Sequence, residues 1–164
     1  MHRVLGILAK YVILVPCSSI CVWWAYSMSK QVGGGVLPLP EAIRLVVEMS
    51  LLTTTLAAIV WAAHPRIHRQ GTWIGLAIKT TLETALILIL YTAAVLFWRN
   101  EWTPGKGMSE SAAFMPVIGH INAEFFSDFL WLEYLLVVVP LVSFLSGVLT
   151  VSFDVLQRRQ QVKS

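Results

Sequence analysis

The chain has 164 residues, of which 57% are hydrophobic and only 13% are charged, and its mean hydropathy is +0.72. Soluble domains contain roughly 45–50% apolar residues and about 25% charged residues. The polar side chains are too few to cover a water-facing surface, which excludes a soluble enzyme. It also excludes a nucleic-acid-binding domain, although the net charge is +3. The composition predicts an integral membrane protein.

Four apolar segments are long enough to cross a bilayer as helices, which takes about 20 residues each. They are residues 11–28, 45–63, 79–98 and 131–153. Segments of this length and composition predict an all-α fold, an integral membrane four-helix bundle. The linkers are too short for a separate soluble domain, so we expect one transmembrane domain over residues 1–164.

The first segment also has features of a secretory signal peptide, because a basic start precedes an apolar run. The apolar stretch from Val4 to Met28 is longer than the 7–15 residues typical of a signal peptide. Bulky aromatic residues also surround the cleavage-like sequence Ala25-Tyr26-Ser27. We therefore expect a retained helix.

Basic residues orient a membrane protein because they remain on the cytoplasmic side. If the N-terminus is cytoplasmic, eight basic residues lie inside and four outside. The inner ones are Arg3, Lys10, Arg66, Arg69, Lys79, Arg158, Arg159 and Lys163, and the outer ones are Lys30, Arg44, Arg99 and Lys106. We expect both termini in the cytoplasm, with a bacterial inner membrane as the default location.

All seven tryptophans fall at or near the ends of the expected helices, as is typical of side chains at the membrane–water interface. They are Trp23, Trp24, Trp61, Trp73, Trp98, Trp102 and Trp131. This placement supports the helix boundaries given above.

Small and hydroxyl-bearing residues indicate how the helices pack. Ser143 and Gly147 form a stripe that permits close approach of another helix. Hydroxyl groups in the second segment are expected to hydrogen-bond across helices; they are Ser50, Thr53, Thr54 and Thr55. Pro16 and Pro140 are expected to kink the first and fourth helices.

A basic residue stands at the start of the third segment and directly before the second, in each case four positions before a glutamate. The pairs are Arg44 with Glu48 and Lys79 with Glu83, and four-residue spacing places each pair on one helix face. The residues next to the first pair also match those next to the second pair, which is consistent either with an inverted repeat or with a chance match. The pairs either snorkel to the interface and hold helices together, or form a polar seam that contacts a partner helix, a proton path or an ion. Because antiparallel helices place them at opposite ends, they argue against a single substrate pocket at the bilayer centre.

Residues 99–130 form the one sizeable segment outside the bilayer, and we expect an extracytoplasmic amphipathic helix before the fourth span. Its apolar side has helical spacing and consists of Ile121, Phe125, Phe129 and Leu132. His120, Glu124 and Asp128 line another face. Such a set is either the wet face of a surface helix, which suits partner docking, or a site for a divalent metal.

The sequence contains no H-E-x-x-H, G-x-S-x-G, C-x-x-C or phosphate-loop motif. The leading hypothesis is therefore a small non-enzymatic subunit of a larger membrane complex for secretion, conjugation, transport or defence. Its expected partners are the lipid bilayer and other membrane subunits or copies of itself, with no nucleic acid and no cofactor. One alternative is a proton- or ion-conducting protein that uses Glu48 and Glu83. Another is a metal-dependent membrane enzyme that uses His120, Glu124 and Asp128.

Overall fold

The computed structural model describes residues 2–31, 39–63, 72–102 and 130–163. The described residues form three uninterrupted helices and a fourth helix made of three consecutive parts. These are α1 (His2–Gln31), α2 (Leu39–Ala63) and α3 (Trp73–Trp102), followed by α6 (Leu130–Glu133), η1 (Tyr134–Val138) and α7 (Val139–Lys163).

Each of these four helices contains a stretch long and apolar enough to cross a membrane. The stretches are Val4–Met28, Ala42–Ala63, Trp73–Leu96 and Trp131–Leu156. This confirms the expected all-α architecture with four candidate spans, which implies contact with a lipid bilayer. The expected amphipathic helix over residues 99–130 falls mostly outside the described residues.

The third helix begins earlier than the apolar pattern indicated, at Trp73 instead of residue 79. Thr72 sets this start, because its Oγ1 accepts a hydrogen bond from the Gly75 backbone N–H at 3.2 Å. A threonine in this position caps the first turn by satisfying a free N–H group. The earlier start moves the charged residues of α3 deeper into the span.

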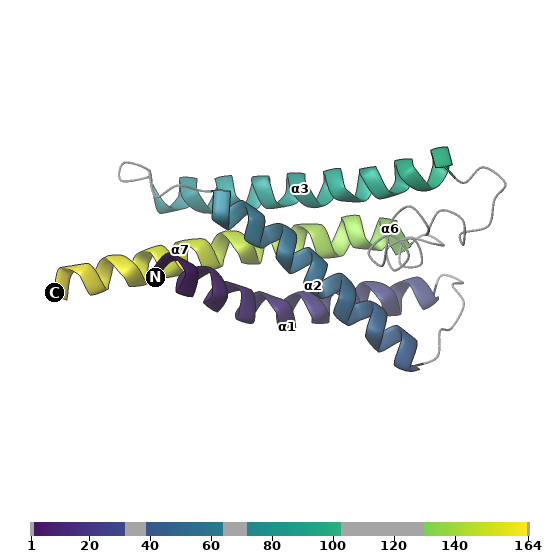
Figure 1. The fold of residues 1–164 in the computed structure, drawn as a ribbon, viewed down its shortest axis with the longest axis horizontal. Coiled ribbons are helices and arrows are strands. Elements are labelled where there is room, and N and C mark those ends of the chain that lie inside the picture. The colour runs from purple at the N-terminus through teal and green to yellow at the C-terminus, as the bar shows by residue number, and fades with distance from the viewer. Residues whose placement is uncertain (1, 32–38, 64–71, 103–129, 164) are drawn as a thin grey trace.

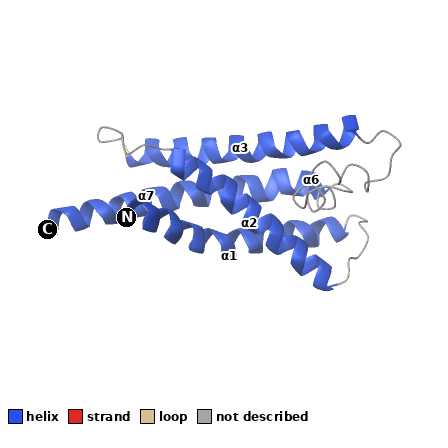
Figure 2. Cartoon of the chain, viewed as in Figure 1, coloured by secondary structure: helices blue, strands red, loops and turns tan. Residues whose placement is uncertain are grey.

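The helices run up and down along one long axis, except that α2 crosses the others obliquely (Figures 1 and 2). The most extensive contacts join α1 to α2 and α3 to α7, and α1 also packs against the fourth helix. The first turns of α1 and the last turns of α7 lie at the same end of the bundle (Figure 1). This follows because a chain that runs up and down through four helices ends on the side where it began.

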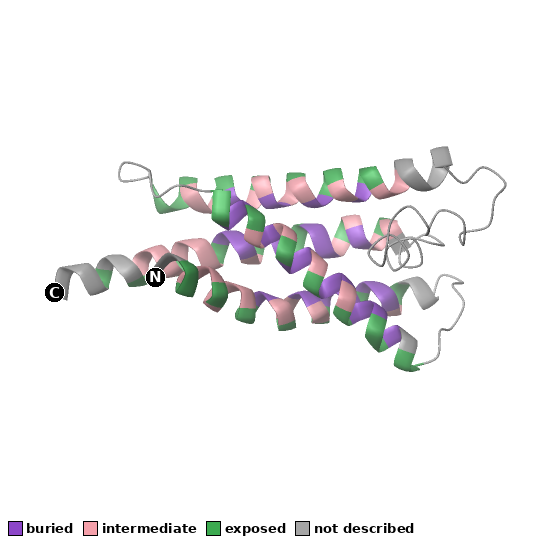
Figure 3. Ribbon diagram, in the orientation of Figure 1, coloured by how far each residue is buried: buried purple, intermediate pink, exposed green. Residues whose placement is uncertain are grey.

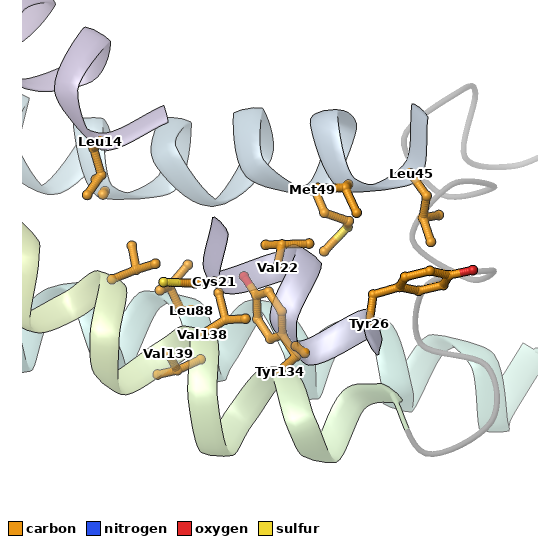
Figure 4. Packing of buried hydrophobic residues seen from close by; sticks show 14 of the residues in the cluster. Leu14, Cys21, Val22, Tyr26, Leu45, Met49, Leu88, Tyr134, Val138 and Val139 are labelled. Carbon is orange, nitrogen blue, oxygen red and sulfur yellow. The ribbon is translucent and has the colours of Figure 1, made fainter. Parts of the chain in front are cut away.

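Buried residues lie along the inner faces of the helices, and exposed residues lie along the outer faces (Figure 3). The Tyr134 ring lies among aliphatic core residues that include Val22 and Val138 (Figure 4). Many of the outward side chains are large and apolar, such as Ile20, Leu82 and Phe144. A surface of this kind suits lipid as the surrounding solvent.

The close contact between α3 and α7 depends on Gly147. A Cβ atom at this position would lie 2.7 Å from the Ala77 carbonyl oxygen and would also meet the Thr81 hydroxyl. The small-residue stripe expected from Ser143 and Gly147 therefore does permit close helix approach, and α3 is the helix that approaches.

The fourth helix contains a π-helical turn just before Pro140. Proline lacks an N–H group, and its ring crowds the carbonyl one turn earlier. In η1 the Val139 N–H bonds to the Tyr134 carbonyl, five residues back, which widens the helix at this point. By contrast, Pro16 lies within α1 without interrupting it.

Candidate functional site

Hydroxyl groups of α2 connect this helix to two of its neighbours. The Thr53 Oγ1 and Tyr134 hydroxyl oxygens are 2.8 Å apart, and both residues are fully buried. Thr54 Oγ1 lies 3.1 Å from Ser18 Oγ of α1. Thr55 Oγ1 lies 3.2 Å from the Tyr11 hydroxyl. The hydrogen bonds across helices expected from these threonines are confirmed.

A second group of polar contacts joins α2, α7 and α3. The Trp61 indole N–H donates to Ser146 Oγ at 2.8 Å, and Ser146 Oγ lies 3.1 Å from Thr84 Oγ1. Thr84 uses its single hydroxyl proton on the Thr80 carbonyl, at 2.7 Å. Ser146 must therefore donate to Thr84, since each hydroxyl has one proton. The result is a directed chain of hydrogen bonds, which we call the Trp61 relay.

Trp61 shows that position near a helix end does not always indicate an interfacial anchor. The residue is only 5% exposed, and its polar atom bonds inside the bundle. Sequence reasoning assigned it to the membrane–water interface with the other tryptophans. The periodicity of α2 offers a signal for its true position, because Trp61 lies on the same face as the buried Thr54 and Ala57.

Lys10 was expected before the first span, but it lies inside the apolar stretch of α1. Its Nζ is 5.4 Å from the centre of the Trp61 ring and 5.9 Å from that of Phe153. The Asp154 carboxylate attracts the same ammonium group. Aromatic faces and a carboxylate stabilise a cation away from water. This cluster joins α1, α2 and α7 near the end where both termini lie.

The Arg44–Glu48 pair lies in the first turns of α2. Arg44 Nε donates to Glu48 Oε1 at 2.9 Å, and the arginine side chain is largely exposed. Counting 1.5 Å per residue, Arg44 lies about 13 Å along the axis from the middle of the span Ala42–Ala63. It is close enough to the membrane surface for the side chain to reach water.

The Lys79–Glu83 pair lies about 5 Å nearer to the middle of its candidate span than the Arg44–Glu48 pair does. Lys79 Nζ is 3.8 Å from Glu83 Oε1, and the two side chains are 47% and 39% exposed. Glu83 lies about 2 Å along the axis from the middle of the span Trp73–Leu96. The apolar pattern, with a span beginning at about residue 79, places this pair one or two turns from the interface. With α3 beginning at Trp73, the Glu83 carboxylate lies near the middle of the candidate span.

The two pairs do not meet. Arg44 and Glu48 belong to the start of α2, and Lys79 and Glu83 belong to the first half of α3, at the opposite end of the bundle (Figure 1). The two pairs therefore do not form a single site.

His120, Glu124 and Asp128 lie outside the described residues, so their arrangement is not part of the structure. Within the described ranges, no group of three histidine, cysteine or acidic residues is placed to hold a metal ion. Cys17 and Cys21 are free thiols.

No known protein family, no curated protein and no solved structure matches this chain.

Proposed function

We propose that the chain is a small non-enzymatic subunit of a larger integral membrane assembly, and that α3 contacts a neighbouring subunit. The Lys79–Glu83 pair carries this proposal, because both side chains are partly exposed within a candidate membrane span and Glu83 lies near its middle. The structure of the single chain leaves them facing outward, where lipid is the only alternative to another protein.

Contact with lipid is unfavourable for such groups. A charged residue at the centre of a membrane helix costs roughly 2.5–3.5 kcal/mol on insertion scales. Ion pairing within α3 offsets part of this cost, but both side chains remain partly exposed at the surface of the single chain. A polar or charged surface on a second subunit would cover it. The Arg44–Glu48 pair does not require a second subunit to cover it in the same way, since its arginine lies near the end of the candidate span.

The proposal is tested by photo-crosslinking in intact membranes. A photoreactive residue at Leu86, on the same helix face as Glu83, is expected to form an adduct with a protein. The matched control is Ile20, which is an exposed aliphatic residue on α1 and is expected to contact lipid. Absence of any protein adduct at Leu86, together with a monomeric chain in mild detergent, contradicts the proposal.

The orientation with both ends in the cytoplasm, in a bacterial inner membrane, belongs to the same proposal. It is supported by the excess of basic residues on that side. A reporter that is active only in the cytoplasm should be active when it is fused to either end of the chain. Activity of an exported reporter at either end contradicts this orientation.

A proton- or ion-conducting function is the second candidate, and the depth of Glu83 favours it. Ionisable residues inside membranes often mark ion or proton pathways. This function predicts that replacing Glu48 and Glu83 with glutamine abolishes flux through proteoliposomes containing the protein. Unchanged flux after both replacements excludes it.

A further inference from the structure

The outer face of α3 carries a heptad pattern of residues that are exposed or partly exposed in the single chain. Residues with alternating spacings of four and three positions lie along it, and every one is at least partly exposed. They are Lys79, Glu83, Leu86, Leu90 and Ala93, and we call them the α3 seam. This 3.5-residue repeat is the spacing with which two helices pack in a left-handed coiled coil.

The charges of the α3 seam are complementary to themselves. Two copies inserted in the same orientation are related by a two-fold axis along the membrane normal, so identical residues lie at equal depth. Lys79 of one copy is then offset from Glu83 of the other by four residues, about 6 Å along the axis. A lysine side chain spans such a distance. Each Lys79 ammonium group can thus pair with the Glu83 carboxylate of the other copy as well as with its own, and neither helix has to shift along its axis.

We propose that the α3 seam pairs with the α3 seam of a second copy of this chain in a parallel dimer. This inference rests on the proposed function and names the subunit that covers the Lys79–Glu83 pair. A second copy supplies both charges at the required depth, whereas a different protein would need an opposite pair at that same depth. The apolar half of the seam, Leu86, Leu90 and Ala93, would pack against its equivalent.

Disulfide crosslinking in native membranes tests the seam directly. The background is the full chain with the substitutions C17A and C21A, because both native cysteines are free thiols. Cysteine is then introduced singly at Leu86 or Leu90 of the seam, or at Leu82 or Ile89 beside it. These four residues are 56%, 59%, 64% and 46% exposed, so the controls match the seam positions in helix, depth and accessibility.

The dimer predicts that L86C and L90C form disulfide-linked pairs on mild oxidation and that L82C and I89C remain mostly monomeric. Equal crosslinking at all four positions, or stronger crosslinking at Leu82 and Ile89, overturns the inference. If the photoreactive residue at Leu86 crosslinks to a different protein and L86C forms no dimer, the inference of a parallel dimer is overturned. The proposed function as a subunit of a larger assembly then still stands. If neither the photo-adduct nor the disulfide dimer forms, the dimer and the proposed function are both contradicted.

A charge swap tests the role of the ion pairs. K79E and E83K, each expressed alone with L90C, create seams of a single sign and should lose the disulfide dimer. Coexpression of the two variants brings opposite signs together and should restore a mixed dimer. Restoration also shows that both variants insert and fold. Failure of the mixture to crosslink, while L90C alone crosslinks, overturns the charge pairing across the seam.

Discussion

The substitution Ser146→Ala interrupts the Trp61 relay at its central residue. Ser146 accepts the Trp61 N–H at 2.8 Å and donates to Thr84 at 3.1 Å. Its loss leaves a buried indole N–H without an acceptor, which costs about 1–3 kcal/mol in soluble proteins. Hydrogen bonds between membrane helices average about 0.6 kcal/mol and reach about 1.7. We therefore expect a loss of about 1–2 kcal/mol, or roughly 2–8 °C in thermal midpoint for a chain of this size.

Ser143→Ala is the matched control. Ser143 lies one turn earlier on α7, is equally buried, and has a hydroxyl with no hydrogen-bond partner among the described residues. Its removal should leave stability unchanged or slightly improved. Reversible unfolding in mixed micelles, followed by circular dichroism, measures both variants. Equal losses, or a larger loss for Ser143→Ala, would refute the relay as a source of stability.

Two further predictions concern helix packing. Gly147→Ala should destabilise the protein by about 1–3 kcal/mol because its Cβ meets the Ala77 backbone, whereas the Cβ of Gly75→Ala meets only the Thr72 side chain and should cost less in the same unfolding assay. Tyr134→Phe removes the 2.8 Å contact with Thr53 and should cost about 1 kcal/mol, a loss that calorimetry in detergent can measure. No loss in either variant would contradict the packing described for it.

The sequence was sufficient to predict the helical class and the number of spans, because length and hydropathy alone determine whether a segment can cross a bilayer. It also identified the inter-helix bonding of Thr53 and Thr54 and the close approach at Gly147, all confirmed by the structure. Small and hydroxyl-bearing residues have few other uses in an apolar helix, so their positions alone are informative.

Features that depend on three-dimensional neighbours could not be predicted in this way. The depth of Glu83 depends on the capping contact of Thr72, which moves the start of α3. Lys10 counts as an ordinary positive-inside residue until the rings of Trp61 and Phe153 are seen around it. The π-helical turn before Pro140 has no hydropathy signature.

The central claim is that α3 crosses the membrane and that one of its outer faces is covered by protein. Spin labels at Leu86 and Leu82, placed one at a time in the C17A and C21A background, test both parts in proteoliposomes. Both residues are exposed in the single chain and lie in the middle of the span. We expect a water-soluble nickel reagent to reach neither label, and oxygen dissolved in lipid to reach Leu82 but not Leu86. Nickel access at both positions, or equal oxygen access at the two, would contradict the claim.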